Sequence, residues 1–359
     1  MKALFISSNL LNNKNGGWQC SNRNFESLKE FYSTTDVYNV SPNNLAHKSI
    51  FTALFNLIKL YSGGLNRNCI IEILSKIKLE NYDLIFLDSS VYGRLAKEIK
   101  KKFPNVRIIT FFHNVEFDFI RKIIYTGGLL HIFRIPSCFY NELLTAKWSD
   151  KLICLTNEDA KLINSLYTKK EIVQIPISFK SVKRDLKSCK ENTNNFISIL
   201  FVGSYFYANT QGILWFINKV KLSANVRLII VGKEMKKLQP LITNNNNIEI
   251  HNSVEDISYF YDQANAVICP LFYGGGMKVK VAEALMYGKK IIGTDLAFYG
   301  YHAEKCSSMI TTISPEIYKD IIENLDPNIR TYENSISHFE KYFSYSSTLK
   351  LFSEVLIQK

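Results

Sequence analysis

The segment 270–288 places three consecutive glycines, two lysines and a glutamate at a fixed spacing. Gly274, Gly275 and Gly276 leave the backbone free to adopt positive φ and to approach a ligand closely. A helix directly after them would point unpaired N–H groups and its positive dipole end at the same spot. Lys278 would lie in the first helical turn, where the dipole disfavours a cation. We therefore expect an anion that neutralises both, although a glycine turn used only for packing is the alternative.

A carboxylate follows this turn on the same helix. Glu283 lies seven residues after Gly276, which is two turns along one face of a helix starting near Met277. Its oxygens could accept hydrogen bonds from hydroxyl groups. A diphosphate at the turn and a ribose beside the helix would fit this arrangement.

The elements that position these residues alternate between strand and helix twice along the chain. Apolar strands separated by amphipathic helices predict an α/β fold with two doubly wound, Rossmann-like parallel sheets. Ligands of such sheets bind beyond the carboxyl ends of the strands, so we expect two domains that face each other across a cleft. The predicted strands are 2–7, 36–40, 82–88, 106–112, 151–155, 172–175, 197–203, 226–232, 248–251, 266–270 and 290–294.

Composition sets the domain boundaries and limits the function classes. The 359 residues are 47% apolar, enough for two cores. We expect an N-terminal domain over 1–177, a Lys-, Ser- and Asn-rich linker over 178–195, a second domain over 196–343 and a C-terminal helix over 344–359. Seven scattered cysteines without C-x-x-C spacing indicate reduced thiols in the cytoplasm. The N-terminus fits a strand better than a signal peptide, and no apolar run is long enough to span a membrane.

The segment 270–288, followed by Lys-Ile-Ile-Gly-Thr at 290–294 and by Gly300, resembles the donor-site signature of retaining glycosyltransferases of family 4, which have the GT-B fold. The resemblance is to the branch with a Gly-x-Gly-x-Lys-x-Lys-x-x-Glu-Ala signature. Segments 200–216 and 228–233 resemble the first strands of that family's nucleotide-binding domain, and 112–116 resembles its central N-domain loop. In this family the last helix crosses back onto the N-terminal domain. The likeness runs in register over nearly the whole chain.

The resemblance implies an enzyme of the EC 2.4 class, a hexosyl- or related transferase. It would move a sugar, with retention of configuration, from a nucleotide-diphosphate donor to a hydroxyl of a glycan or lipid-linked acceptor in cell-surface polysaccharide synthesis. No cofactor is expected, and no metal either, because the chain has no Asp-x-Asp. The alternatives are a GT-B sugar-nucleotide epimerase and a non-catalytic sugar-nucleotide-binding scaffold.

The same resemblance assigns roles to individual residues. His113 follows the strand 106–112, at its carboxyl end, and would help stabilise charge on the donor. With Lys278 and Glu283 it forms the expected catalytic set, and Asn114 and Glu116 are candidates on the acceptor side, where Glu116 could instead cap a helix. Thr156 or Asn157 is expected to be a helix N-cap. The expected donor-binding residues are Gly16, Gly17, Gly203, Ser204, Gly232, Lys233, Val254, Gly274, Gly275, Gly276, Met277 and Lys280.

The sequence departs from the wider family in two respects. Many members carry Glu where Gly275 stands, near the hydroxyls of the donor sugar. Many also carry an Arg after the glycine of the first C-domain strand and a Lys about six residues later, where this chain has Ser204 and a neutral Asn209-Thr210 pair. The diphosphate charge must then be met elsewhere, by Lys278 first and Lys280 next.

A net charge of +12, mostly from lysine, suits an anionic membrane surface or a phosphate-bearing acceptor. Nucleic acid fits least well, because Arg is scarce and no recognised motif occurs. The stretches 50–61, 119–125 and 129–135 are rich in bulky apolar residues and also contain Lys or Arg, as interfacial helices do. They predict a peripheral contact of the N-terminal domain with the inner face of the cytoplasmic membrane. Core helices or a dimer contact would explain them equally well, and the sequence leaves the oligomeric state open.

Overall fold

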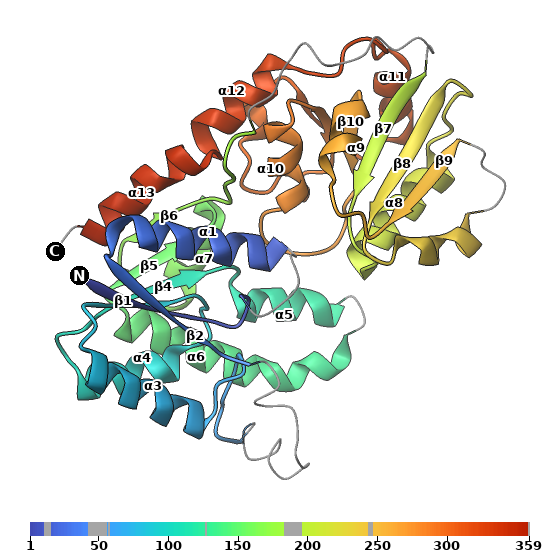
Figure 1. Ribbon diagram of the computed structural model, residues 1–359. Helices are drawn as coiled ribbons and strands as arrows, with labels where there is room; N and C mark the ends of the chain where they lie inside the picture. The colour runs from blue at the N-terminus through green and yellow to red at the C-terminus, as the bar shows by residue number, and fades with distance from the viewer. Residues whose placement is uncertain are drawn as a thin grey trace. The chain divides into compact units, whose positions relative to one another are not determined.

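The structure is a computed structural model that describes residues 1–10, 16–41, 56, 58–125, 128–182, 196–242 and 247–357. The chain divides into two compact units, each built on one parallel sheet (Figure 1). Unit 1 comprises residues 1–177 and 348–359, and unit 2 comprises residues 178–347.

The sheet of unit 1 has six parallel strands in the order β2-β1-β3-β4-β5-β6. The chain order reverses beside β1, so β1 and β3 flank a topological switch point, where open α/β sheets bind their ligands. The strands are β1 Lys2–Ser7, β2 Thr34–Asn39, β3 Leu84–Leu87, β4 Arg107–Phe112, β5 Lys151–Cys154 and β6 Ile172–Gln174.

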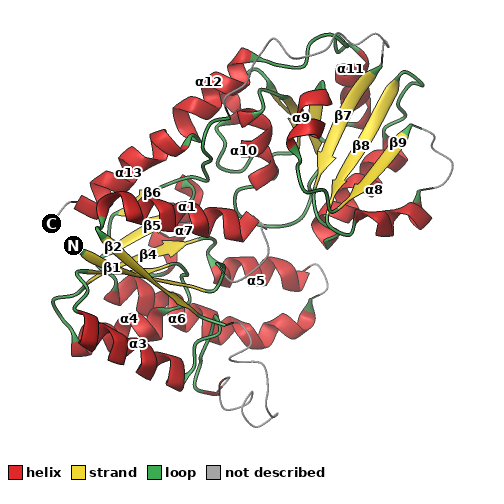
Figure 2. Cartoon of the chain, in the orientation of Figure 1, coloured by secondary structure: helices red, strands yellow, loops and turns green. Residues whose placement is uncertain are grey.

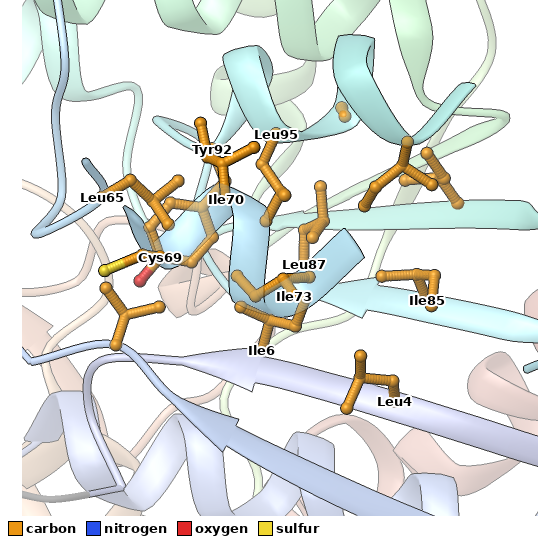
Figure 3. Close-up of a cluster of buried hydrophobic side chains, with 14 of the residues drawn as sticks. Leu4, Ile6, Leu65, Cys69, Ile70, Ile73, Ile85, Leu87, Tyr92 and Leu95 are labelled. Atoms are coloured by element: carbon orange, nitrogen blue, oxygen red, sulfur yellow. The ribbon is translucent and has the colours of Figure 1, made fainter. Parts of the chain in front are cut away.

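Helices cover both faces of this sheet (Figure 1). They are α1 Gly16–Phe31, α3 Arg67–Glu80, α4 Gly93–Lys102, α5 Glu116–Tyr125, the 3-10 helix η2 Leu129–Arg134, α6 Ile135–Trp148 and α7 Asn157–Leu166. On one face, Leu4 and Ile6 of β1 and Ile85 of β3 pack with Ile70 and Ile73 of α3 (Figure 3). The strand side chains are buried on both faces, which is why these strands read as continuous apolar runs.

The C-terminal helix α13, Tyr345–Ile357, is held on the opposite face of unit 1. The guanidinium of Arg107 donates to the carbonyl oxygens of Leu356, at 2.9 Å, and Val355. The guanidinium of Arg23 lies 5.1 Å from the Phe352 ring centroid and 5.7 Å from that of Phe111. Cation–π contacts and charged hydrogen bonds therefore fasten this helix.

The sheet of unit 2 has six parallel strands in the order β12-β11-β10-β7-β8-β9, so its switch point lies between β7 and β10. Figure 2 shows β7, β8 and β9 side by side at one edge of this sheet. The strands are β7 Ile197–Val202, β8 Val226–Gly232, β9 Ile248–Asn252, β10 Ala266–Cys269, β11 Lys290–Gly293 and β12 Met309–Thr311. The helices are α8 Tyr207–Lys219, η4 Met235–Leu241, α9 Ser258–Gln263, α10 Val279–Met286, η5 Ala303–Lys305, α11 Pro315–Glu323 and α12 Glu333–Tyr342.

One face of this sheet is closed by α8, η4 and α11, with Phe216 and Tyr318 among the largest buried side chains. The prediction of two doubly wound, Rossmann-like sheets is confirmed. The strand β12 was not predicted, and β2 begins and ends earlier than 36–40. Of the predicted linker, residues 183–195 lie outside the described residues. Phe179, in the first part of the predicted linker, forms a parallel β-bridge with Ser344 inside unit 2.

Candidate active site

The carboxyl ends of β7 and β8 approach each other so closely that only glycine fits at Gly232. A Cβ atom built there would lie 1.7 Å from the carbonyl oxygen of Gly203, and its φ is +156°. Gly203 itself faces the side chain of Asn209, whose Cγ would lie 2.8 Å from an added Cβ. These two predicted donor-site glycines thus lie side by side at the edge of the sheet where a ligand would enter.

The glycine-rich turn follows β10, the strand on the other side of the switch point. Gly274 and Gly276 have φ of +114° and +64°, which favour glycine. The helix α10 begins at Val279, not near Met277 as predicted, and Lys278 is its N-cap residue. The Lys278 ammonium donates to the carbonyl oxygens of Gly275, at 2.8 Å, and Gly276, at 2.7 Å. Lys278 therefore stabilises the shape of the turn through its own carbonyl groups.

Lys280 is the second residue of α10, and its side chain reaches toward the end of β7. Its ammonium donates to Asn209 Oδ1 at 2.9 Å and lies 4.4 Å from the Phe201 ring centroid. The Asn209 amide in turn donates to the Ser204 carbonyl at 3.0 Å. Burial lowers the pKa of Lys280 to about 8, although the Glu283 carboxylate favours the charged ammonium. Ser204 and Asn209, where the resemblance to family 4 would place cations, are therefore linked by hydrogen bonds to a cation carried by α10.

Glu283 is oriented by a buried tyrosine. The Tyr261 hydroxyl donates to Glu283 Oε2 at 3.3 Å and lies 3.4 Å from the Lys280 carbonyl. Tyr261 stacks on Tyr287 with ring centroids 4.5 Å apart. Burial and the nearby Glu283 charge raise the pKa of Tyr261 well above its ordinary value, so its hydroxyl remains a donor. Tyr261 therefore fixes the position of the Glu283 carboxylate, which lies on the same helix as Lys280.

The remaining donor-side candidates lie at neighbouring strand ends. Lys233 follows β8 with an exposed side chain, and its carbonyl accepts from Tyr205 N at 2.8 Å. Val254 follows β9 and comes directly after Ser253, which has φ of +54°. Met277 is buried beside the glycine turn.

In unit 1, His113 joins a buried polar cluster at the switch point. Its Nε2 lies 3.0 Å from Asp88 Oδ1 and 3.4 Å from Ser21 Oγ. Asp88 also accepts from Ser7 Oγ at 2.7 Å and from the Asn24 amide at 2.9 Å. The carboxylate is therefore satisfied from β1, from α1 and from the loop after β4.

The charges of this cluster depend on each other. Burial disfavours the imidazolium, but the Asp88 carboxylate outweighs burial and raises the pKa of His113 well above its ordinary value. Burial alone would raise the pKa of Asp88, yet the His113 charge and the hydrogen bonds hold it below its ordinary value. At neutral pH the pair is an imidazolium beside a carboxylate.

The acceptor-side candidates lie next to this cluster, where one expectation needs correction. Glu116 is the first residue of α5 but does not cap it. The Glu142 carboxylate on α6 accepts from the backbone N–H of Glu116, at 2.7 Å, and Phe117, at 3.1 Å. Burial raises the pKa of Glu142 to about 7. The Asn114 amide donates to Glu116 Oε1 at 3.4 Å, and burial raises the pKa of Glu116.

The other helix starts in unit 1 follow the sequence more closely. Thr156 is the N-cap of α7 and accepts from Asp159 N at 3.0 Å, as predicted. Asn157 is the first residue of that helix. Gly16 and Gly17 open α1, and residues 11–15 before them lie outside the described residues.

Sequence reasoning missed Asp88, Asn209 and Tyr261 as site residues. Asp88 ends a predicted strand that neighbours β1, and that position is the signal by which it could have been found. Asn209 and Tyr261 lack such a signal, because only packing shows which side chains they meet. Within the described ranges, no three His, Cys, Asp or Glu side chains group as a metal site requires. In the same ranges, no helix is both long and apolar enough to cross a membrane.

Comparison with known proteins identifies one matching family model and one relative. Residues 197–325 match the family model described as glycosyl transferases group 1. An uncharacterized 44.6 kDa protein in the cps region of Klebsiella pneumoniae is 25% identical over 287 residues, covering 71% of this chain and 69% of that protein.

Solved structures share the fold over the whole chain. Sucrose-phosphate synthase from Thermosynechococcus elongatus superimposes with a TM-score of 0.72 at 13% identity, covering 100% of this chain and 98% of that one. HepE of Anabaena in complex with UDP gives 0.68 at 11% identity, covering 99% and 100%. The fold is thus that of the GT-B glycosyltransferases. With the group 1 domain over 197–325, these findings support a glycosyltransferase, a transferase of the EC 2.4 type.

Proposed function

We propose that this protein is a retaining, metal-independent glycosyltransferase of family 4 that uses a nucleotide-diphosphate sugar, with UDP as the first nucleotide to test. The observation that carries the proposal is the cation at the switch point of unit 2. Lys280 reaches Asn209 beside the glycine-rich turn, where a diphosphate would meet both the turn and the ammonium. A solved neighbour, HepE, was crystallised with UDP, which supports that choice of nucleotide.

Each donor-site residue then has a distinct task. Glu283 would accept hydrogen bonds from the ribose hydroxyls while Tyr261 keeps its carboxylate in place. Lys280 would neutralise the diphosphate, and Lys278 would keep the glycine turn open for it. The backbone at Gly203 and Gly232 would approach the sugar nucleotide without side-chain obstruction, and Val254 would contact it through its backbone.

The chemical step needs stabilisation of the departing phosphate more than a protein nucleophile. Charge at the leaving group would be met by Lys280 and by N–H groups at the start of α10. The acceptor hydroxyl would attack from the face that the leaving group vacates, and a phosphate oxygen would take its proton. The new bond therefore keeps the configuration of the broken one.

The acceptor is proposed to be a glycan or a lipid-linked glycan of cell-surface polysaccharide synthesis. The relative encoded in the cps (capsule) region of Klebsiella pneumoniae supports this class. Unit 1 adds a surface suited to lipid. In η2, Leu129, Leu130, Ile132 and Phe133 are 70%, 83%, 52% and 61% exposed.

Basic residues accompany this apolar surface in the sequence. Arg121, Lys122 and Arg134 lie within residues 119–135, which contain no acidic residue, although Lys122 is paired with Asp118 at 2.6 Å. Exposed apolar side chains among cations are typical of helices that bind an anionic membrane interface. Of the three predicted interfacial stretches, 129–135 is thus exposed, whereas 50–61 lies mostly outside the described residues.

A binding screen followed by a transfer assay tests the proposal. We expect one of UDP-, GDP-, ADP- and CMP-sugars to raise the melting temperature, because a ligand that binds only the folded state stabilises it. With that donor and an extract of lipid-linked glycans, transfer should proceed in EDTA, and the new linkage should keep the anomeric configuration of the donor by NMR. An inverted linkage, or activity abolished by EDTA and restored by Mn²⁺, would contradict the mechanism.

Liposome flotation tests the lipid surface separately. The wild-type protein should float with anionic vesicles at low salt, and a variant with Leu130→Ser and Phe133→Ser should not. Ile317→Ser, at a 49% exposed apolar residue of α11, is the matched control and should float like the wild type. Equal recovery of all three proteins would refute a role for η2.

A further inference from the structure

Two tyrosines of unit 2 form an exposed pair beside the glycine-rich turn. Tyr207 is the first residue of α8, and Tyr273 directly precedes Gly274. Their ring centroids lie 5.3 Å apart with a tilt of 50°, yet the two residues are 45% and 40% exposed. Burying an aromatic side chain is strongly favourable, so a pair that stays half in water is a candidate binding surface.

The fold holds this pair in place, because α8 packs directly on the segment after β10. A Cβ atom added at Gly212 of α8 would lie 1.9 Å from the carbonyl oxygen of Pro270, so the two backbones touch there. Trp215 of α8 packs on Phe272 with ring centroids 4.8 Å apart. The exposed pair thus continues a row of contacts between the same two segments. A surface fixed in this way loses little conformational entropy when a ligand binds.

The chemistry of the pair matches the chemistry of a sugar ring. Each tyrosine has an apolar ring face and a hydroxyl at the ring's edge that can donate or accept. A pyranose has the same division, with C–H groups on its faces and hydroxyls around its rim. The proposed lipid surface of η2 differs, because three of its four exposed apolar side chains are aliphatic.

The position of the pair in the sheet favours a sugar over a nucleobase. The expected base contacts, Lys233 and Val254, follow β8 and β9. The pair instead joins the segments that follow β7 and β10, on the other side of β7 in the strand order. This is the side of the glycine-rich turn, where the proposed donor has its diphosphate and the sugar that is transferred.

We propose that Tyr207 and Tyr273 form a platform on which a pyranose ring of the acceptor glycan stacks. This inference rests on the proposed function, which it deepens by assigning part of the acceptor site to the donor-binding domain. The platform consists of unit 2 residues alone. Stacking uses the C–H face of sugars such as glucose or galactose, so it tolerates several sugars, as stacking on nucleobases tolerates several bases.

Glycan binding without a donor tests the platform independently of sugar transfer. The probe is an array of capsular polysaccharide and lipopolysaccharide glycans, of which the wild-type protein should bind a subset. The variant Y207A/Y273A should bind those glycans roughly tenfold or more weakly, because each aromatic contact contributes roughly two- to tenfold in affinity. The variant Y207F/Y273F keeps both rings and should bind like the wild type.

Two measurements complete the test. Tyr259→Ala is the matched control and should leave glycan binding unchanged, because Tyr259 is a 63% exposed residue of α9 in the same unit and also contacts an aromatic ring, that of Phe260. UDP affinity measured by calorimetry should be the same in all of these proteins, since the platform is separate from the expected base contacts. In saturation-transfer NMR with a bound array glycan, the C–H protons of one sugar face should receive the strongest transfer.

Four results would overturn the inference. The first two are a wild-type protein that binds no glycan of the array and a Y207A/Y273A variant that binds as well as the wild type. Loss of binding in Y207F/Y273F would mean that the hydroxyls and not the ring faces hold the sugar. A roughly tenfold fall of UDP affinity in Y207A/Y273A would identify the pair as a nucleobase site.

The outcome remains decisive if the double variant does not fold or the transfer reaction proves wrong. In the first case the single variants Y207A and Y273A decide, each with an expected loss of roughly two- to tenfold in glycan affinity. In the second case, a protein that binds array glycans through these rings but transfers no sugar would refute the proposed function and retain the platform.

Discussion

Replacing Lys280 by Met tests the donor site most directly. The change keeps an unbranched side chain over Phe201 but removes the ammonium that reaches Asn209. A hydrogen bond to a charged group contributes about 1.5–3 kcal/mol, so UDP binding should weaken by roughly ten- to a hundredfold at pH 7. The Asn209 amide keeps its bond to the Ser204 carbonyl, so the fold should survive.

The pKa of Lys280 adds a signature that simple loss of contact would not produce. Burial lowers this pKa from 10.5 to about 8, which makes the charged form about 3 kcal/mol costlier than in water. A bound diphosphate favours the ammonium and raises the pKa again, so binding above pH 8 must take up a proton. Affinity should therefore fall by up to about tenfold for each pH unit above 8.

Calorimetry can count that proton. At pH 8.5, titration of UDP in two buffers of different ionisation enthalpy should show uptake of roughly three quarters of a proton by the wild type, from a pKa of about 8. K280M should take up none, and uridine, which has no phosphate, should give none with either protein. The matched variant Lys278→Met should keep the proton uptake, because Lys278 contacts the carbonyl groups of the turn.

Two results would refute this reasoning. Binding by the wild type without proton uptake would mean that the diphosphate does not meet Lys280. Loss of the uptake in K278M together with its retention in K280M would identify Lys278 as the phosphate-binding lysine.

Three further outcomes follow from the structure. Glu283→Ala should weaken donor binding or turnover tenfold or more with an unchanged melting temperature, and unchanged kinetics would remove the ribose assignment. Gly232→Ala should lower the free energy of unfolding in urea by several kcal/mol, since its Cβ would meet the Gly203 carbonyl at 1.7 Å; a loss below about 1 kcal/mol would contradict this. Because the pKa of Glu142 is raised to about 7, ionising it opposes folding. Wild-type stability should thus decline relative to Glu142→Gln between pH 4.5 and 7 and stay level above, and a constant difference would show that Glu142 ionises freely.

The fold could be predicted from the sequence because its main signals are local. Strands such as β3, with all four residues buried, read as short apolar runs bounded by polar turns. The short edge strand β12, Met309–Thr311, lacks such a run, because only its first residue is buried. The start of α10 was misplaced by two residues, since the cap geometry of Lys278 depends on its contacts with the turn.

The candidate site could be predicted only where a motif carried it. Glycines at the turn and at strand ends indicate positive φ or close backbone contacts, so these parts of the site could be predicted from the sequence. The partners of Lys280 and His113 did not, because Asn209 is 71 residues from Lys280 and Asp88 is 25 from His113. Likewise, nothing local to Glu116 shows that the carboxylate capping α5 belongs to Glu142, on the next α-helix but 26 residues away. Side chains that meet through tertiary packing have no characteristic separation in the sequence, so a motif cannot predict the pair.

The attachment of α13 to unit 1 makes this domain discontinuous in the chain. Its sheet is complete at Gln174, but Arg107 also donates to carbonyl groups of residues 355 and 356, and Arg23 also packs against Phe352. During synthesis all of unit 2 must therefore leave the ribosome before unit 1 can close. Until then the face of unit 1 that α13 covers, which includes Arg23 and Arg107, remains exposed and could be bound by a chaperone. A fragment ending at residue 177 would carry the same open face permanently, so the two domains cannot be separated by a single cut.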